Sequence, residues 1–189
     1  MPTSRDEYTQ ANRQAWNEVA PRHARHNNAE LFELFRNPDY VDFKGAVLDA
    51  LLQVGVRDKA IIQLCCNNAR ETVSLRNMGA RYCVGVDGAE DFLAQGQELI
   101  KIAGAQDQVK LVHSDIYYLP DELIGAFDVA LITIGVISWM PDLQGFFNAV
   151  QSVLKPGGFL VLEDMHPVLF MYDENPDGGP SSIHTSHIQ

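Results

Sequence analysis

Apolar residues follow two different patterns along the chain, and the change between them falls near Lys59. In the first part they recur every three or four positions, which is the spacing of an amphipathic helix. Ser4 and Glu7 form a capping box at the start of this pattern, and Pro21 interrupts it. The pattern predicts three helices, which run from Ser4 to Pro21, over 31–35, and over 43–55.

After Lys59, short apolar runs alternate with amphipathic segments. The runs predict strands over 60–65, 82–87, 109–115, 127–135 and 158–164, and the segments between them predict helices over 70–78, 89–103 and 142–154. Near-continuous apolar strands joined by helices are typical of a parallel sheet that is covered on both faces. Because such crossovers are right-handed, we expect an α/β protein with a doubly wound, mainly parallel sheet and N-terminal helices.

The chain length favours one domain, since 189 residues bury one sizeable core. We expect 1–189 to be a single domain, with a helical N-terminal region over 1–57, a sheet-containing core over 58–166, and a loop or disordered tail over 173–189. The first residues are polar, unlike a signal peptide, and no apolar run reaches the roughly 20 residues of a membrane span. The sequence therefore predicts a cytoplasmic protein without a membrane partner.

The charge balance argues against nucleic acid as a partner. The formal net charge is -11, and an acidic surface repels phosphate backbones. The only basic cluster consists of Arg22, His23, Arg25 and His26, and such a cluster is more typical of a solvated linker. The three cysteines, Cys65, Cys66 and Cys83, match no zinc spacing and are interpreted as reduced, buried residues. No metal site is expected.

Ligands of an open parallel sheet bind at the carboxyl ends of the strands. The first strand is followed there by the loop 65–70, and the second ends at Asp87, twenty positions after Asn67. An acidic residue at that place can accept hydrogen bonds from both hydroxyls of a ribose. The third strand is followed by 114–116, where a carboxylate and backbone groups can meet an adenine edge, and the fourth ends at 133–135, beside the expected reaction centre.

The first loop distinguishes between nucleoside cofactors. A dinucleotide needs glycines so that the backbone can approach its pyrophosphate, and 65–70 contains none. S-adenosylmethionine (SAM) has no phosphate, and an acidic cleft tolerates its sulfonium cation. Asn67 and Asn68 can adopt left-handed backbone angles at modest cost, and Ala69 keeps the turn narrow. The loop therefore favours SAM over NAD or FAD.

Four segments resemble the motifs of class I SAM-dependent methyltransferases, which have a Rossmann-like sheet. They are IIQLCCNNARET (61–72), GVDGAEDFL (85–93), VHSDIYYLP (112–120) and the stretch 127–164 with its Lys-Pro-Gly-Gly turn. They occur in the family's order and spacing and cover about 60–165. The resemblance implies cofactor contacts by Gln63, Cys65 and Asn67 at the methionine, Asp87 at the ribose, Ser114, Asp115 and Ile116 at the adenine, Ile134 near the methionine amine, and Trp16 and His23 from a lid of N-terminal helices.

Two departures from the family pattern stand out. Gln63 replaces the usual acidic residue of the first loop, and Cys65, Asn67 and Ala69 replace its three glycines. This chain reads Gln63-Leu64-Cys65 there and is similar to a subset of the family whose first loop starts with Leu-Gln-Cys. The family sheet also continues into two further strands, whereas this chain stops soon after the fifth. Either the chain is a truncated product, or another chain, such as a second copy in a homo-oligomer, covers the open edge.

Several of these residues have simpler alternative roles. Asp87 and Asp115 can cap the following turns, Cys65 and Cys66 can be core residues, and the loop at Trp139 can be mere packing. His166 follows the fifth strand and is a weak candidate for a general base, although a hydrogen-bonded loop histidine is the preferred interpretation. Its spacing from Glu163 and Asp164 does not indicate a metal site.

The sequence predicts a transferase that moves the methyl group of SAM to a small-molecule acceptor by in-line displacement. Proximity and orientation in a closed pocket would then supply most of the catalysis. One alternative is a non-catalytic SAM-binding or interaction module with a degenerate fold, which the altered first loop favours. A second is an NAD-dependent oxidoreductase, which the glycine-free loop disfavours.

Overall fold

The computed structural model describes residues 4–166 and 168, apart from the side chains of His26 and Asn27. The tail predicted over 173–189 lies outside the described residues, as does the side chain of His26 in the basic cluster. No helix in the described part is long and apolar enough to cross a membrane.

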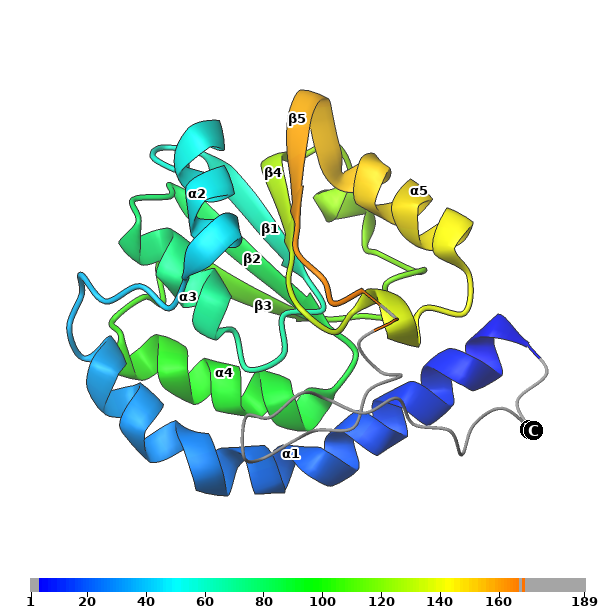
Figure 1. Ribbon diagram of the computed structural model, residues 1–189, viewed down its shortest axis with the longest axis horizontal. Coiled ribbons are helices and arrows are strands. Elements are labelled where there is room, and N and C mark those ends of the chain that lie inside the picture. The colour runs from blue at the N-terminus through cyan, green and yellow to red at the C-terminus, as the bar shows by residue number, and fades with distance from the viewer. Residues whose placement is uncertain (1–3, 167, 169–189) are drawn as a thin grey trace.

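A five-stranded, fully parallel sheet forms the centre of the molecule (Figure 1). Its strands are β1 (Ala60–Leu64), β2 (Tyr82–Asp87), β3 (Val109–His113), β4 (Phe127–Ile132) and β5 (Leu154–Leu162), in the order β3-β2-β1-β4-β5. The chain therefore winds outward in both directions from β1, and the order reverses between β1 and β4. The predicted doubly wound α/β fold is confirmed.

Helices cover both faces of the sheet because alternate strand residues are buried on opposite sides. The elements that flank it are α2 (Gly45–Val54), α3 (Arg70–Asn77), α4 (Glu90–Ile102), α5 (Leu143–Val153) and two short 3-10 turns, η1 (Asp121–Leu123) and η2 (Ile137–Trp139). One core layer joins α2, α3 and α4 to strand residues such as Ile61 and Leu131, and the other joins α5 to Ile62 and Ile132. The helices and strands predicted after residue 42 are thus found, with ends that differ by a few residues.

The N-terminal region corrects the sequence prediction. Instead of one helix that ends at Pro21 and another over 31–35, the chain forms a single helix, α1 (Arg5–Phe35). Proline lacks the N–H that would bond the carbonyl four residues earlier, so Pro21 weakens the helix locally. Contacts with α4 hold the helix together across this point: the carbonyl of Ala20 accepts from Gln95 Nε2 at 3.0 Å, and Ala20 is fully buried.

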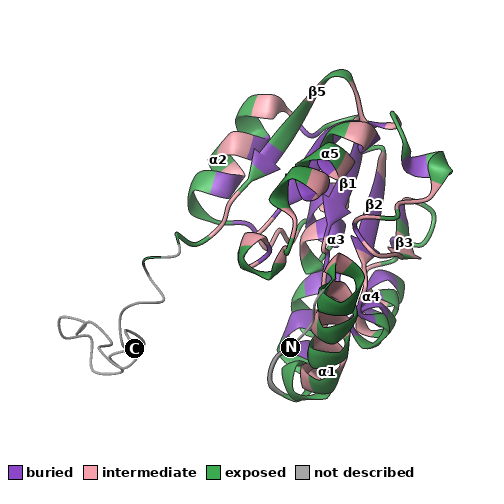
Figure 2. Ribbon diagram, turned by 90° about the vertical axis from the view of Figure 1, so that its right-hand side faces the viewer, coloured by how far each residue is buried: buried purple, intermediate pink, exposed green. Residues whose placement is uncertain are grey.

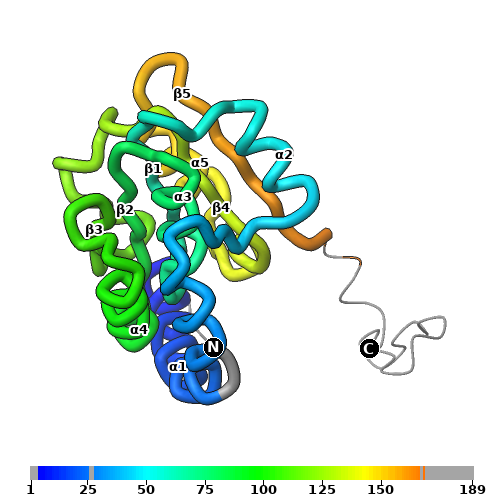
Figure 3. The backbone as a smooth tube through the Cα atoms, turned by 90° about the vertical axis from the view of Figure 1, so that its left-hand side faces the viewer, coloured from blue at the N-terminus to red at the C-terminus, as the bar shows by residue number. Residues whose placement is uncertain are grey.

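Helix α1 lies along α4, beyond the carboxyl ends of the strands (Figures 1 and 3). Its start matches the predicted capping box in part, since Ser4 Oγ accepts from the N–H of Glu7 at 3.3 Å. Most of its residues remain exposed, whereas the strands in the middle of the sheet are buried (Figure 2). The helix therefore forms an outer layer over one end of the sheet.

Strand β5 begins at Leu154, four residues before its predicted start, because Leu154 already pairs with Phe127 of β4. The register then shifts between Phe127 and Val129, which takes up the Lys-Pro-Gly-Gly sequence. β5 is the last strand at its side of the sheet, and Phe159 remains 52% exposed on it. Among the residues that the structure describes, no further strand pairs with the outer edge of β5, and apolar side chains are exposed on this strand.

Candidate functional site

A cavity of about 540 Å³ lies at the carboxyl ends of the central strands, beneath α1. Its volume falls in the range of about 300–1,000 Å³ that is typical of small-molecule sites. It sits beside the reversal of strand order between β1 and β4, which is where doubly wound sheets bind ligands. The topology therefore produces the cavity.

The structure brings ten sequence-predicted site residues together around this cavity. They are Trp16, His23, Gln63, Cys65, Asn67, Asp87, Ser114, Asp115, Ile116 and Ile134. His166 does not line the cavity; it is exposed, and its Nδ1 accepts a hydrogen bond from the N–H of Val168 at 3.2 Å. This geometry corresponds to the loop histidine that was the preferred interpretation.

The loop after β1 has the backbone conformation that glycine would adopt most easily. Cys65, Asn67 and Ala69 have φ angles of 58°, 51° and 62°. Such angles are uncommon for residues with a side chain and cost roughly 1 kcal/mol or more each. Asn68 does not share them: its N–H instead donates to Asn67 Oδ1 at 2.8 Å. The loop therefore follows a glycine-type path without glycine.

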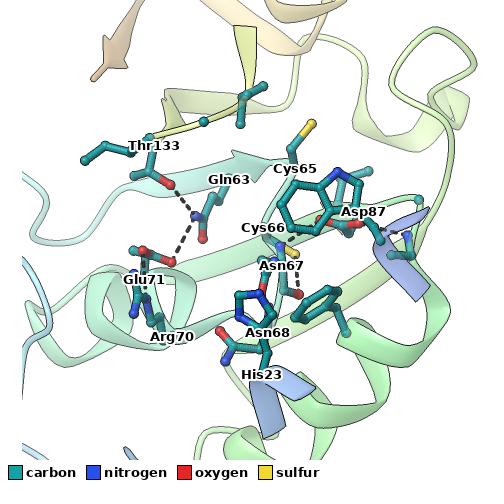
Figure 4. A pocket seen from close by; sticks show the side chains of 18 of the residues that line it. His23, Gln63, Cys65, Cys66, Asn67, Asn68, Arg70, Glu71, Asp87 and Thr133 are labelled. Atoms are coloured by element: carbon teal, nitrogen blue, oxygen red, sulfur yellow. Dashed lines mark hydrogen bonds and ion pairs between the residues drawn. The ribbon is translucent and has the colours of Figure 1, made fainter. Parts of the chain in front are cut away.

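Asp87 stabilises this loop. Its Oδ2 accepts from the N–H of Asn67 at 2.7 Å, and its Oδ1 accepts from the N–H of Ala89 at 2.8 Å (Figure 4). Burial raises the pKa of Asp87, while the neighbouring backbone N–H groups, of which those of Ala89 and Asn67 donate to it, act in the opposite direction. Each carboxylate oxygen has a second lone pair, so Asp87 can cap the loop and still accept from a ligand.

A polar cluster links the end of β1 to the first turn of α3 (Figure 4). Gln63 is 1% exposed; its Oε1 accepts from the hydroxyl of Thr72, and its Nε2 donates to Glu71 Oε2 and Thr133 Oγ1, both at 3.4 Å. Glu71 Oε1 accepts from Arg70 Nε at 3.0 Å. The carboxylate of Glu71 can only accept, which fixes the orientation of the Gln63 amide.

The sequence interpretation missed Arg70 and Glu71, which line the cavity. Acidic residues in the first turn of a helix are common because they complement the helix dipole, so Glu71 carries no special signal of its own. The sequence signal that could have pointed to Glu71 was Gln63, because this amide stands where the family has an acidic residue and leaves the end of β1 uncharged. The carboxylate of Glu71, in the first turn of α3, supplies a negative charge close to that position.

The segment after β3 combines turn capping with a place at the cavity. Asp115 Oδ1 accepts from the N–H of Tyr117 at 3.0 Å, and Ser114 Oγ donates to the carbonyl of Tyr118 at 2.9 Å. Ile116 is 8% exposed. The cavity therefore has an apolar side chain next to polar backbone at this end, which is a suitable surface for a flat heteroaromatic ring.

Aromatic side chains connect α1 to the cavity wall. The ring of Trp16 lies 5.2 Å from that of Trp139 and 6.0 Å from that of Phe92, and His23 packs edge-on against Phe92 at 5.4 Å. Asn12 Nδ2 donates to the carbonyl of Trp139 at 2.8 Å. Trp139 was expected to be mere packing, and it both packs and lines the cavity.

Asp164 fixes the loop after β4. Its carboxylate accepts from the N–H groups of Gly135, Ile137 and Met165, each at 2.7 Å. Burial raises the pKa of Asp164, but the hydrogen bonds from Ile137, Gly135, Met165 and the intervening Val136 outweigh it, so the pKa lies below its usual value. This clamp positions Ile134, which is 58% exposed.

The three thiols are free. Cys66 and Cys83 are fully buried, as predicted, whereas Cys65 is partly exposed to the cavity. Burial raises the pKa of all three, and that of Cys83 reaches about 12. They are therefore protonated at neutral pH and make poor nucleophiles or metal ligands.

Comparison with known proteins gives a family match. The family described as "Methyltransferase domain" matches residues 61–158, just over half of the 189 residues. The tRNA U34 carboxymethyltransferase of Aliivibrio salmonicida (strain LFI1238) is 28% identical over 110 residues, which cover 58% of this chain and 33% of that protein. The chain thus spans about a third of the length of the curated relatives it matches.

Two solved structures illustrate the shared fold. The SAM-dependent methyltransferase from Mesorhizobium loti has a TM-score of 0.57 at 24% identity, covering 74% of this chain and 65% of that one. Phosphoethanolamine N-methyltransferase 1 from Haemonchus contortus, in complex with phosphoethanolamine and S-adenosylhomocysteine, has a TM-score of 0.61 at 14% identity, covering 84% and 32%. At these identities the similarity establishes the fold.

Proposed function

The chain belongs to the methyltransferase domain family, whose cofactor is SAM, and from this premise we propose that it binds SAM in the cavity and transfers the methyl group to an acceptor. The observation that carries the proposal is the alignment of the four strand ends β3, β2, β1 and β4 along one cavity beneath α1. A long, narrow nucleoside ligand can lie across them.

The residues present fit the cofactor from one end to the other. Ile116 and the backbone after β3 would hold the adenine, and Asp87, which keeps free lone pairs on both oxygens, would accept from the ribose hydroxyls. The cofactor's amino-acid end would then reach the polar residues at the end of β1, and the methyl would face the loop after β4. This placement assigns a role to the predicted residues at the ends of β1, β2, β3 and β4.

The protein's own contribution to the reaction would be binding, orientation and exclusion of water. The sulfonium of SAM supplies an activated methyl group. Trp16, Trp139 and Phe92 form an apolar wall beneath α1, which excludes water and limits the directions from which an acceptor can approach. His166 lies outside the cavity, so the proposal assigns it no role as a base.

We propose a small-molecule acceptor. The cavity is roofed by α1, and the net charge of -11 opposes a phosphate backbone. The names of the relatives favour a second candidate, methyl transfer to tRNA, since those proteins act on tRNA. Labelled methyl transfer from SAM to bulk tRNA, compared with transfer to a metabolite extract, distinguishes the two. Label in the tRNA fraction alone would refute the small acceptor.

Calorimetric titration of the purified chain with SAM, S-adenosylhomocysteine and NADH tests the cofactor assignment. We expect micromolar binding of the first two and no binding of NADH, because the loop after β1 lacks the glycines that a pyrophosphate needs. A folded chain that binds none of the three would contradict the proposal and favour the interaction module. Binding without turnover over a broad acceptor panel would favour a non-catalytic SAM-binding module.

A further inference from the structure

We propose that Glu71, on the first turn of α3, binds the ammonium group of the cofactor's amino-acid end. The inference rests on the proposed function, since it concerns the same cavity. Glu71 lines the cavity, and its side chain is only 12% exposed. The sequence position of Glu71 does not predict this role, because the family pattern has its acidic residue at the end of β1 and Glu71 lies on the following helix.

The strand order locates the amino-acid end of the ligand. With the adenine at β3 and the ribose at β2, the rest of the molecule continues to β1, the next strand in the sheet. The β1 end and the adjoining first turn of α3 carry the cluster of Gln63, Arg70 and Glu71. The zwitterionic end of the cofactor therefore lies against this cluster.

Gln63 is poorly placed to bind the ammonium itself, because it is only 1% exposed. Its carbonyl oxygen accepts from the hydroxyl of Thr72, and its amide N–H groups point to Glu71 and Thr133. An ammonium carries only donors, so the exposed side of this amide would face it with donors as well. The role of Gln63 is to hold the carboxylate of Glu71 in place, which makes it a positioning residue.

Charge balance supports the same assignment. The carboxylates of Glu71 and Asp42 share one guanidinium, since Arg70 Nε lies 3.0 Å from Glu71 Oε1 and 3.5 Å from Asp42 Oδ2. Two carboxylates and one guanidinium leave one negative charge in excess at the cavity, where the side chains of Glu71 and Asp42 are 12% and 20% exposed, so a positive group is favoured there. The ammonium of the zwitterionic end would be the part of the ligand that faces Glu71. The carboxylates of Asp87 and Asp115 lie at the ribose and adenine ends.

Two probes isolate this contact. S-adenosylhomocysteine carries the amino-acid end, and 5′-methylthioadenosine has the adenosine and sulfur but lacks it. Glu71→Gln should weaken binding of S-adenosylhomocysteine about 10- to 100-fold, the effect of losing a hydrogen bond to a charged group, and leave binding of 5′-methylthioadenosine within about twofold. Glu90→Gln is the matched control, because Glu90 is also in the first turn of a helix but is 72% exposed and outside the cavity.

An exchange variant tests the pairing directly. In the double variant Gln63→Glu/Glu71→Gln, the carboxylate introduced at position 63 can accept from Thr72 and from the amide introduced at position 71. The hydrogen bonds therefore survive, and the negative charge moves from α3 to β1. We expect this variant to recover most of the affinity for S-adenosylhomocysteine.

Three outcomes would overturn the inference. The first is wild-type affinity of Glu71→Gln for S-adenosylhomocysteine, and the second is equal loss of both probes that the exchange does not restore. The third is a wild-type chain that binds neither probe, which rejects the proposed function and this inference with it. Only the third outcome affects the cofactor assignment, so failure of the inference about Glu71 can be distinguished from failure of the proposed function.

Discussion

Replacing Asp87 by Asn should separate ligand binding from stability. The carboxylate holds two backbone N–H groups, those of Asn67 and Ala89, and is proposed to hold the ribose hydroxyls. The amide has nearly the same shape, but only its oxygen accepts. One of the two backbone N–H groups would therefore face an NH₂ donor, and the ribose would lose a charged acceptor.

The expected magnitudes differ for the two properties. Loss of a hydrogen bond to a charged acceptor weakens S-adenosylhomocysteine binding by about 1.5–3 kcal/mol, or roughly 10- to 100-fold. For folding, an unpaired N–H costs about 1–3 kcal/mol, but the substitution also removes a carboxylate whose pKa burial has raised. We expect these effects to cancel to within about 1 kcal/mol in the free energy of unfolding.

The pH dependence gives the sign of the charge effect. Because the pKa of Asp87 is raised above 3.8 in the fold, its favourable contribution to stability is present at lower pH and is lost as pH rises through the folded pKa. The unfolding free energy of the Asn variant relative to wild type should therefore increase as pH rises from about 4 through the raised pKa of the folded state.

Calorimetric titration and urea unfolding of the same samples measure both quantities. Asp91→Asn is the control, because Asp91 is exposed on the next helix and outside the cavity. Wild-type affinity for S-adenosylhomocysteine in a folded Asp87→Asn variant would refute the ribose assignment. A loss of several kcal/mol in the free energy of unfolding would instead refute the expected cancellation of the two effects on folding and make Asp87 a mainly structural residue.

Three further predictions concern the surroundings of the site. Trp16→Ala removes two aromatic contacts of about 0.5–1.5 kcal/mol each and should reduce S-adenosylhomocysteine affinity about tenfold in titrations; unchanged affinity would argue against α1 as a lid. Asp164→Ala should lower the unfolding free energy by about 1.5–3 kcal/mol at pH 7, and because the folded pKa is depressed, this deficit should disappear as pH falls below about 4 in urea titrations; a deficit independent of pH would exclude the carboxylate as its source. A thiol reagent at pH 7 should leave Cys66 and Cys83 of the folded chain unmodified and label both after denaturation, and rapid labelling of either one in the native chain would contradict their burial.

The sheet could be predicted from the sequence because its strands are short, nearly continuous apolar runs separated by helical segments. Residues that follow such strands lie at one edge by topology, so Asp87 and Asp115 could be assigned to one site without any knowledge of side-chain positions. The family resemblance added the assignment of Gln63, Cys65, Asn67 and Ile134 to the methionine end of the cofactor and of the N-terminal helices to a lid.

The length of α1 could not be predicted because it depends on tertiary contacts. Pro21 is a strong local signal for a helix end, and only the packing of Ala20 against α4 and the hydrogen bond from Gln95 outweigh it. The place of Glu71 at the cavity could not be predicted for a related reason. Its partnership with Gln63 crosses from a strand to a helix, and a separation of eight residues has no regular periodic meaning.

The two halves of α1 are anchored very differently, and this determines how a ligand would enter and leave. Beyond Pro21, Leu31 and Phe35 are buried in the main core, whereas no residue from Ser4 to Val19 is buried. The first half is held by exchangeable contacts such as Asn12 with Trp139, which water can replace. We expect this half to swing about Pro21 while the second half stays in place. Residence time would then be a property of the helix, and Pro21→Ala should slow dissociation of S-adenosylhomocysteine in stopped-flow experiments more than it changes the equilibrium affinity.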